Sequence, residues 1–447
     1  MTFGDATYGL ACPVRGRWIV SFVVCFLVPF GTLHAQTAAP IFENLAPIAK
    51  AVCKAGPDQD PNNIILPRGA IRTINDRGHI SSVLRRSIDV AIDDVSSVVL
   101  TISVARGTLR RVRSELLQIT QTDAEIDRKG RPVALIDLAS DCSVIHGRSL
   151  TYGETGKAVS LVHYDRNLVP DGTEEALNPP VPPGTDPGGI AVGHIDSGVN
   201  YLLPKIAGRL ARSADGKLRG MDFWDEDDRP FDIDTGRSAF FPIRHGTTVA
   251  SVLLREAPTA RLVPYRYPRP DLARMGPLIA HMAKLGVRIV MMPLGSRKVS
   301  DWQAFLEAAS RHSEILFIVS AGNDGRNIDT DPLYPASLAL ENMIVVTSSD
   351  AFGRLAQGSN WGANSVDIMV PGEKVEVIDH RGATGQASGS SFAVPRVAAL
   401  AARLAEIHPE WTAAELSAAI RKRAGRSFER GTAKVGWGWI PNPADDG

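Results

Sequence analysis

Residues 190–198 read IAVGHIDSG, an apolar run that ends in a carboxylate and a Ser-Gly turn. Comparable runs, each followed by a turn, occur at residues 288–292, 315–319 and 343–347. Short apolar runs without polar alternation are typical of parallel strands that helices cover on both faces. For residues 190–447 the sequence therefore predicts an α/β fold, a doubly wound and mostly parallel sheet with helices on both faces.

The segments between the predicted strands carry helix signals. Residues 300–303 and 412–415 have the spacing of a capping box, and the second opens a pattern that stops at Gly425. Another helix is predicted at residues 397–405, with Pro395 close enough to its start to be tolerated in the first turn.

Four polar side chains stand where such a sheet would place a catalytic site. Asp196 follows the first apolar run, at the carboxyl end of its strand, and His245 opens the segment HGTTVASVLL. Ser391 lies in GSSFAVP, and Asn323 in AGND offers a carboxamide N–H for an oxyanion. A serine becomes a nucleophile when an imidazole takes its proton and a carboxylate orients the imidazole. His194, inside the apolar run, is predicted to be a packed core histidine rather than a ligand or base.

The order Asp, His, Asn, Ser in these motifs resembles the subtilisin family of serine peptidases, from about residue 190 to the end of the chain. The resemblance implies Ser391 as nucleophile, His245 as general base and then general acid, and Asp196 as the orienting carboxylate. It implies Asn323 as oxyanion donor together with the backbone N–H of Ser391. The expected activity is that of an exported serine endopeptidase, which hydrolyses polypeptide substrates through an acyl-enzyme.

Further segments resemble the substrate-binding parts of the family. Residues 287–295 (VRIVMMPLG) look like its substrate-binding strand, which assigns Leu294 and Gly295 to substrate binding. Pro293 replaces the usual serine there and removes an N–H from the strand. Leu333 stands where the family has the floor of the primary specificity pocket, so we expect a preference for small or medium apolar residues before the scissile bond. The alternative is that Leu333 is an ordinary core residue.

Two more positions depart from the family while the triad stays intact. Thr248 replaces a second histidine, and Ser251 replaces a glycine. Thr248 and Pro293 support an alternative function, a catalytically weak or inactive subtilisin-fold protein that binds peptides. A non-peptidase acyl hydrolase with the same triad is a third hypothesis.

The first 189 residues are predicted to hold three further segments. Residues 1–35 have the charge, apolar run and small residue of a secretory signal peptide, so we expect export to the periplasm or the medium and no lasting membrane span. Residues 36–177 mix a helix near residues 42–54 with strands such as residues 97–104, which predicts a smaller α+β domain. Residues 178–189 form a Pro/Gly-rich linker.

The family resemblance gives the N-terminal domain one of two roles. By analogy it is an intramolecular inhibitor and chaperone that self-cleavage removes; the alternative is a permanently attached accessory domain. Cys53 and Cys142 are the even pair left after the predicted signal peptide, and we predict a disulfide between them, with two separate buried thiols as the alternative.

Charge and metal-ligand patterns add few constraints. The 49 basic and 49 acidic residues cancel, so no overall field attracts nucleic acid or an anionic membrane. No cofactor is expected to be required. The acidic run of residues 222–234 matches no EF-hand spacing and is expected to be a solvated loop; the alternative is that its oxygens bind a structural calcium ion.

Overall fold

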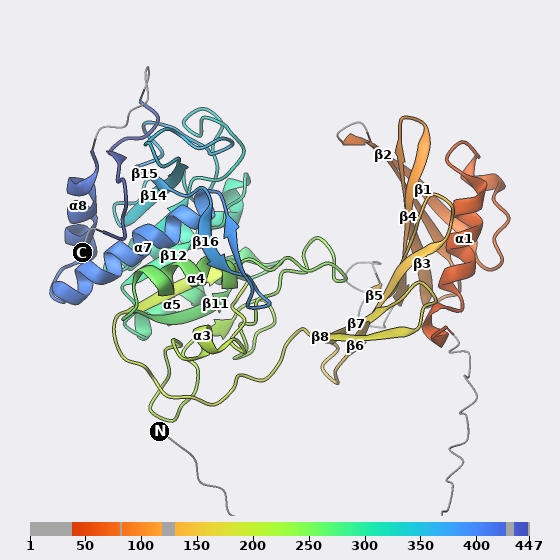
Figure 1. Cartoon of the computed structure of the whole chain (residues 1–447), viewed down its shortest axis with the longest axis horizontal. Coiled ribbons are helices and arrows are strands. Elements are labelled where there is room, and N and C mark those ends of the chain that lie inside the picture. The colour runs from red at the N-terminus through yellow and green to blue at the C-terminus, as the bar shows by residue number, and fades with distance from the viewer. Residues whose placement is uncertain (1–37, 81–82, 119–129, 426–432, 446–447) are drawn as a thin grey trace, which may run out of the picture. The chain divides into compact units, whose positions relative to one another are not determined.

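The computed structural model describes residues 38–80, 83–118, 130–425 and 433–445 (Figure 1). The predicted signal peptide lies outside these residues. Within them, no helix combines the length and the apolar character needed to cross a membrane.

The described residues between 38 and 177 form an antiparallel sheet with a helix against it (Figure 1). Its eight strands follow one another in chain order, each paired with the next. They are β1 (Ala70–Ile80), β2 (Val83–Ala91), β3 (Ser96–Ala105), β4 (Thr108–Gln118), β5 (Arg131–Leu138), β6 (Val144–Tyr152), β7 (Ala158–Tyr164) and β8 (Pro170–Ala176). The predicted strand at residues 97–104 is β3, and the predicted helix is α1 (Leu45–Ala55), whose apolar face packs on β3, β4 and β5. The predicted α+β class is confirmed.

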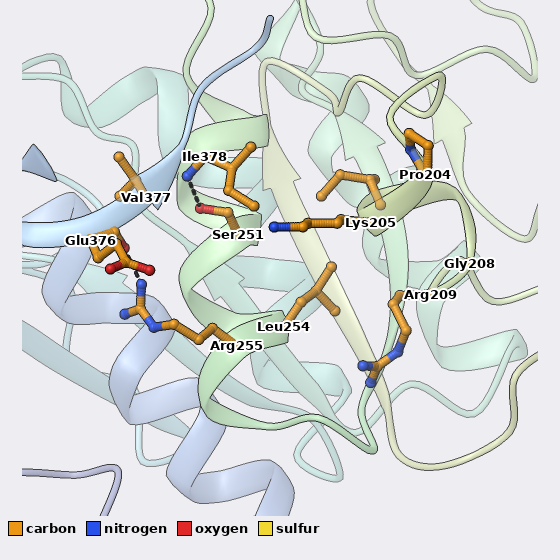
Figure 2. A pocket seen from close by; sticks show the side chains of 11 residues that line it. Pro204, Lys205, Gly208, Arg209, Ser251, Leu254, Arg255, Glu376, Val377 and Ile378 are labelled. Atoms are coloured by element: carbon orange, nitrogen blue, oxygen red, sulfur yellow. Dashed lines mark hydrogen bonds between the residues drawn. The ribbon is translucent and has the colours of Figure 1, made fainter. Parts of the chain in front are cut away.

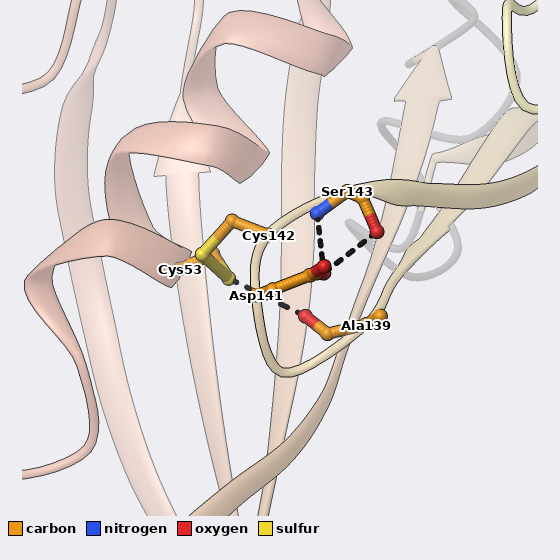
Figure 3. The surroundings of a disulfide bond; sticks show 5 residues. All are labelled: Cys53, Ala139, Asp141, Cys142 and Ser143. Carbon is orange, nitrogen blue, oxygen red and sulfur yellow. Dashed lines mark hydrogen bonds between the residues drawn. A yellow bond between two sulfur atoms is a disulfide. The ribbon is translucent and has the colours of Figure 1, made fainter.

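A disulfide joins α1 to the turn between β5 and β6 (Figure 3). Cys53 lies in the last turn of α1 and is 3% exposed, and its Cα atom is 5.7 Å from that of Cys142. The predicted pairing is present, and the alternative of two free thiols is not what the structure contains.

The second sheet is parallel throughout, as predicted for residues 190–447. Its spatial order is β10 (Met221–Asp222), β11 (Arg261–Arg266), β9 (Ala191–Asp196), β12 (Ile289–Met292), β13 (Leu316–Ser320), β14 (Met343–Ser349), β15 (Ile368–Pro371) and β18 (Gly438–Trp439). The four predicted strands are β9, β12, β13 and β14. Because β9 lies inside the sheet, between β11 and β12, the residues at its carboxyl end meet loops from both sides.

Helices cover both faces of this sheet, as predicted (Figure 1). One apolar layer holds α4 (Gly246–Glu256), α7 (Ser390–Ile407) and α8 (Ala413–Arg423), and the other holds α5 (Met275–Lys284) and α6 (Gln303–Arg311). The short helix α3 (Pro204–Ala207) follows β9, and a hairpin of β16 (Val375–Ile378) and β17 (Thr384–Ala387) precedes α7.

The two predicted capping boxes have different outcomes. The one at Thr412 and Glu415 is formed and begins α8, which ends at Arg423, two residues before the predicted stop. The one at residues 300–303 is wrong: a 3-10 turn occupies Val299–Trp302, and α6 begins at Gln303 without a side-chain cap. The indole of Trp302 is 2% exposed, and burial of this large ring fixes the first turn against the local capping preference.

The predicted linker has no helix or strand, but hydrogen bonds attach it to the parallel-sheet region. The Asp186 carboxylate accepts from the backbone N–H of Arg212 at 2.7 Å and from the guanidinium of Arg261 at 2.5 Å. The hydroxyl of Tyr201 donates to the carbonyl of Pro179 at 2.6 Å. Residues 178–189 are therefore fixed along their length and are not a free spacer.

Residues 231–244 lead directly into His245 and contact the antiparallel sheet. Phe240 is fully buried among leucines of β5, β6 and β7. The ring of Phe241 lies between the guanidinium groups of Arg113 and Arg148, each 4.2 Å from its centroid. Such cation–π contacts add to the apolar burial that fixes this segment.

Candidate active site

Asp196 is the last residue of β9 and is 4% exposed. Its Oδ1 accepts from the backbone N–H of Ser197 at 2.7 Å and lies 3.2 Å from the Ser197 hydroxyl oxygen. Both carboxylate oxygens lie close to Nδ1 of His245, at 2.9 Å for Oδ1 and 2.8 Å for Oδ2. The carboxylate thus fixes the proton on Nδ1 and leaves Nε2 as the basic nitrogen.

His245 precedes the first residue of α4, as its place before an apolar helical pattern predicted. Its backbone N–H donates to Asp232 Oδ1 at 3.1 Å, and its ring is about one third exposed (31%). The next residue is Gly246, and a side chain would not fit there. A Cβ atom at this position would lie 2.0 Å from the carbonyl oxygen of Gly198. Backbone contacts therefore fix the position of His245, while part of its ring stays accessible.

Ser391 lies in the first turn of α7, and this corrects the predicted helix start. The helix begins at Ser390, not near residue 397, so Pro395 is beyond the first turn. The missing N–H of Pro395 is the one that would donate to the carbonyl of Ser391. Ser391 is 9% exposed, at the helix end whose dipole favours negative charge.

The side chain of Asn323 follows β13 and is oriented by the residue next to the nucleophile. Its Oδ1 accepts from the backbone N–H of Ser390 at 2.8 Å and from the Ser390 hydroxyl at 2.9 Å. Because a backbone N–H can only donate, the atom facing it must be the amide oxygen, and Nδ2 is the end left for an oxyanion. Gly389, at φ 135°, permits this contact, since a Cβ atom there would lie 3.1 Å from Asn323 Oδ1.

The structure brings the predicted catalytic residues together to different degrees. Asp196 and His245 are in direct contact, whereas the described part of the chain contains no hydrogen bond between Ser391 and His245. The ring of Phe392, the residue after Ser391, packs against the imidazole with centroids 6.1 Å apart. Catalytic hydrogen bonds are often long in enzymes without substrate and shorten when the complex forms.

The three predicted substrate-binding residues lie in two segments, one after β12 and one after β13. Leu294 and Gly295 follow β12, and Gly295 is exposed. Leu333 is 9% exposed, and a Cβ atom built at Gly322 would lie 2.5 Å from its Cδ2. The same methyl group would lie 3.5 Å from a Cβ atom at Gly295. Leu333 is thus a core residue, and it also fills the space between Gly295, in the segment after β12, and Gly322, in the loop that carries Asn323.

Three residues near the site escaped the sequence analysis or received another role. His194 is packed in the core as predicted, but its Nε2 also lies 3.3 Å from Asp196 Oδ2. Asp232, expected in a solvated acidic loop, is fully buried and accepts from Ser197 Oγ at 2.6 Å. Asn360 was not singled out, and its buried amide holds the loop around Asn323.

The electrostatics of the pair favour an ionised carboxylate beside a basic imidazole. Burial alone would raise the pKa of Asp196, but the charge of His245 and hydrogen bonds from His194 and His245 bring it far below the ordinary value. Burial alone would lower the pKa of His245, but the charge and hydrogen bond of Asp196 raise it above the ordinary value, with Asp232 adding to the effect.

Residues 188–438 match the model of the Subtilase family, over more than half of the 447 residues. The chain belongs to the subtilase family. The match spans all four strands predicted from the sequence together with Asp196, His245, Asn323 and Ser391.

Curated relatives of this subtilase align over part of their length. The "Thermophilic serine proteinase" of Bacillus sp. (strain AK1) is 28% identical over 232 residues, which are 48% of this chain and 52% of that protein. "Subtilisin E" of Bacillus subtilis (strain 168) is 28% identical over 151 residues, 33% of this chain and 39% of that protein. The chain thus spans about half of the length of these relatives, or less.

Solved structures of subtilisin-like proteins also align with this subtilase. A cold-adapted subtilisin-like serine proteinase is 24% identical, with 57% of this chain and 91% of that chain covered and a TM-score of 0.46. The epidermin leader peptide processing serine protease of Staphylococcus aureus is 18% identical, with 59% and 76% covered and a TM-score of 0.47.

Ser251, where the subtilase pattern has glycine, connects α4 to the β16–β17 hairpin. Its Oγ accepts from the backbone N–H of Ile378 at 2.9 Å, the bond drawn in Figure 2, and donates to the carbonyl of Thr248 at 2.7 Å. The bond lies at a pocket of about 410 Å³ between α3, α4 and β16, with Leu254 on one wall and Lys205 at its rim. None of the seven predicted site residues lines this pocket.

The acidic run of this subtilase does not fit a calcium ion. Asp222 Oδ1 accepts from two backbone N–H groups, and the guanidinium of Arg266 contacts the carboxylates of both Asp222 and Asp225. A guanidinium thus occupies the place between these carboxylates that a cation would take. The described residues contain no cluster of three or more His, Cys, Asp or Glu side chains that could hold a metal ion. The expected solvated loop is wrong for Asp222 and Asp232, which are fully buried; calcium binding by the protein stays a prediction.

Proposed function

We propose that this subtilase is a serine endopeptidase that hydrolyses peptide bonds through an acyl-enzyme on Ser391. The observation that carries the proposal is the Asp196–His245 contact, in which one imidazole nitrogen lies within 2.9 Å of both carboxylate oxygens. That contact fixes the tautomer in which Nε2 can accept a proton from a serine hydroxyl.

The expected reaction begins when His245 Nε2 takes the proton of Ser391 and Oγ attacks the scissile carbonyl carbon. The oxyanion that forms would receive hydrogen bonds from Asn323 Nδ2 and the backbone N–H of Ser391, at the positive end of α7. The imidazolium then protonates the leaving amine, and water hydrolyses the acyl-enzyme with His245 again as the base. Asp196 stays ionised throughout and stabilises the imidazolium.

The substrates we propose are polypeptides with a small or medium apolar residue before the scissile bond. Leu333 supports this preference because its Cδ2 lies close to both Gly322 and Gly295, where a long substrate side chain would need space. Substrate backbone would pair with the segment after β12, at Leu294 and the exposed Gly295.

We also propose an exported enzyme, in the periplasm or the medium, whose residues 36–177 act first as an intramolecular inhibitor and chaperone. The signal-like residues 1–35 and the disulfide in the N-terminal sheet support export, because disulfides persist in oxidising compartments. N-terminal sequencing of the exported protein tests the second part, since a start near residue 178 means removal and a start near residue 36 means retention.

The function is tested by comparing the wild type with Ser391→Ala for casein hydrolysis and for labelling by a fluorophosphonate probe. Ser388→Ala is the matched control, because Ser388 lies three residues away, is exposed and hydrogen-bonds only to the backbone N–H of Lys374 in the described residues. We expect both activities in the wild type and the control and neither in Ser391→Ala. Wild type that neither cleaves nor labels, even after removal of residues 36–177, would support the inactive peptide-binding alternative.

A further inference from the structure

The buried histidine two residues before the triad carboxylate has no part in the reaction described above. Residues two apart in a strand face the same way, so His194 and Asp196 share one face of β9. The side chain of His194 is fully buried, and its Nε2 lies 3.3 Å from Asp196 Oδ2. That oxygen is also 2.8 Å from His245 Nδ1. Two imidazoles therefore meet at one carboxylate oxygen.

One arrangement of protons suits the surroundings of His194. Its Nδ1 is buried and has no hydrogen-bond partner in the described part of the chain. A protonated ring nitrogen is a donor, and a buried donor without an acceptor is costly. The proton therefore belongs on Nε2, which donates to Asp196, and Nδ1 carries the lone pair.

We propose that His194 is a positioning residue of the triad, whose Nε2–H holds Asp196 Oδ2 toward His245 and takes up part of the carboxylate's charge. The proposal rests on the proposed peptidase function. Ser197 fixes only the other oxygen, Oδ1, through its backbone N–H. His194 is thus a fully buried donor that fixes Oδ2 from within the sheet.

Other charged and titratable groups surround this pair and stay unchanged in the test below. Those that interact with Asp196 or His245 from the neighbouring segments, directly or through Asp232, are Asp232, Asp234, Arg244, Tyr267 and His380. Arg266 is the residue opposite Asp196 on the neighbouring strand β11. Within the described residues, the side-chain hydrogen bonds to Asp196 Oδ2 come from the two imidazoles. A change at His194 therefore alters the charge on Oδ2 directly.

The test compares three variants. His194→Leu removes the donor and keeps a similar volume, whereas His194→Gln keeps a donor near Nε2. His281→Leu is the control, because His281 hydrogen-bonds to the hydroxyl of Tyr265 at 2.9 Å in the apolar layer on the other face of the sheet. Each is measured for kcat and KM on one peptide across pH.

We expect His194→Leu to lower kcat about tenfold with KM unchanged. The acid-side midpoint of kcat/KM should rise by about half a pH unit, because a carboxylate with one donor fewer stabilises the His245 imidazolium more. His194→Gln should restore most of both values, and His281→Leu should change neither. A wild-type midpoint in His194→Leu, or equal impairment in the Leu and Gln variants, would overturn the proposal.

A second measurement needs no variant and no activity. In ¹⁵N-histidine NMR of the wild-type protein, we expect a protonated Nε2 and an unprotonated Nδ1 for His194 at neutral pH. The opposite tautomer would overturn the proposal even if His194→Leu does not fold. Because this readout is independent of turnover, failure of the inference is distinct from failure of the peptidase function, which an inactive, unlabelled wild type would reveal.

Discussion

Two carboxylates act on His245 at different atoms. Asp196 contacts the ring at Nδ1, and Asp232 accepts from the backbone N–H while its charge adds to that of Asp196. The pKa of Asp232 is itself held below the ordinary value, since hydrogen bonds from His380, Ser197 and Thr247 outweigh the effect of burial, which would raise it. The imidazole therefore works beside fixed negative charge over the whole neutral range.

This arrangement predicts the pH dependence of activity. Burial would lower the pKa of His245, but Asp196 raises it, and the general base must be unprotonated. We expect kcat/KM to rise with pH, with an acid-side midpoint above the ordinary histidine value of about 6.5. Because the folded pKa is raised, the stability that the imidazolium contributes is present below the ordinary value and is lost as pH rises through the folded pKa. Activity should thus appear as this stability is lost.

The measurement is kcat/KM on a short peptide between about pH 5 and about pH 9, with unfolding followed at each pH. Unfolding data serve as the control, because a loss of folded protein at low pH would imitate the titration. A midpoint at or below the ordinary histidine value would contradict the prediction.

Leu333 gives a second prediction at this scale. Leu333→Gly should open the space between Gly295 and Gly322, and so raise kcat/KM about tenfold for peptides with Phe before the scissile bond relative to Ala. Leu338→Ala is the control, since Leu338 packs against the same core. If the wild-type enzyme already cleaves best after Phe or Lys, the proposed preference for small or medium apolar residues is wrong.

Some contacts of the site could be predicted from the sequence and others could not. The contact between Asp196 and His245 follows from motif order and strand position. The contact between His194 and Asp196 could also have been predicted, because residues two apart in a strand have their side chains on the same face. The position of Asp232 beside His245 could not have been predicted, because it depends on the path of residues 231–244, which no local sequence pattern determines. Its carboxylate instead looked like part of a solvated acidic run.

At the scale of elements, the loop after β13 depends on one buried amide. Asn360 is fully buried, its Oδ1 accepts from the N–H groups of Asp324 and Arg326 at 2.9 and 3.1 Å, and its Nδ2 donates to Ala321 at 2.8 Å. The residues that Asn360 bonds lie on both sides of Asn323 in the sequence, so these bonds fix the loop that carries it. Asn360→Ala should therefore lower the free energy of unfolding by about 3 kcal/mol and also lower kcat about tenfold with little change in KM.

Asn342→Ala is the matched control for Asn360→Ala. Asn342 is buried as well, at 7% exposed, and the two hydrogens of its Nδ2 are shared among the carbonyls of Ala309, His312 and Ile315 at the other end of β13. We expect a similar loss of stability and wild-type kcat per folded molecule. Equal kcat in the two variants would mean that Asn360 has no influence on the oxyanion donor.

Element types were predictable, and some element boundaries were not. The apolar runs fix β9, β12, β13 and β14, because a strand buried on both faces needs no polar positions. The start of α7 was placed too late, since Pro395 is ordinarily a first-turn residue. Burial of nearly the whole helix in the apolar layer stabilises the turn before it despite the missing N–H.

At the scale of the whole molecule, the parallel sheet assembles the site from distant parts of the sequence. Asp196, Asn323 and Ser391 are far apart in the sequence. However, only β12 separates β9 from β13 in the sheet, and the carboxyl ends of these parallel strands lie on the same side. Sequence patterns predicted this class of sheet but not its strand order, because order depends on which faces the crossovers cover. The eight-stranded antiparallel meander was likewise beyond the residue patterns, which indicated only helix and strands before the linker.

The disulfide gives the prediction that belongs to this scale. Cys53 and Cys142 are 89 residues apart, and closing a loop of that size in the unfolded chain is expected to stabilise the fold by about 4 to 5 kcal/mol. The loop holds β1 to β5, so most of the antiparallel sheet forms inside it. Cys53→Ser with Cys142→Ser should therefore lower the midpoint of the first unfolding transition, and a reducing agent should lower the wild-type midpoint to the same value.

Denaturant unfolding of the oxidised wild type, the reduced wild type and the double variant makes the comparison. The double variant with reducing agent is the control, and it should show no further shift because it has no bond left to break. If reduction leaves the wild-type midpoint unchanged, the antiparallel sheet does not depend on the bond. Its stability would then come from the apolar face of α1 against β3, β4 and β5, where Leu45, Ile48 and Val52 are almost fully buried.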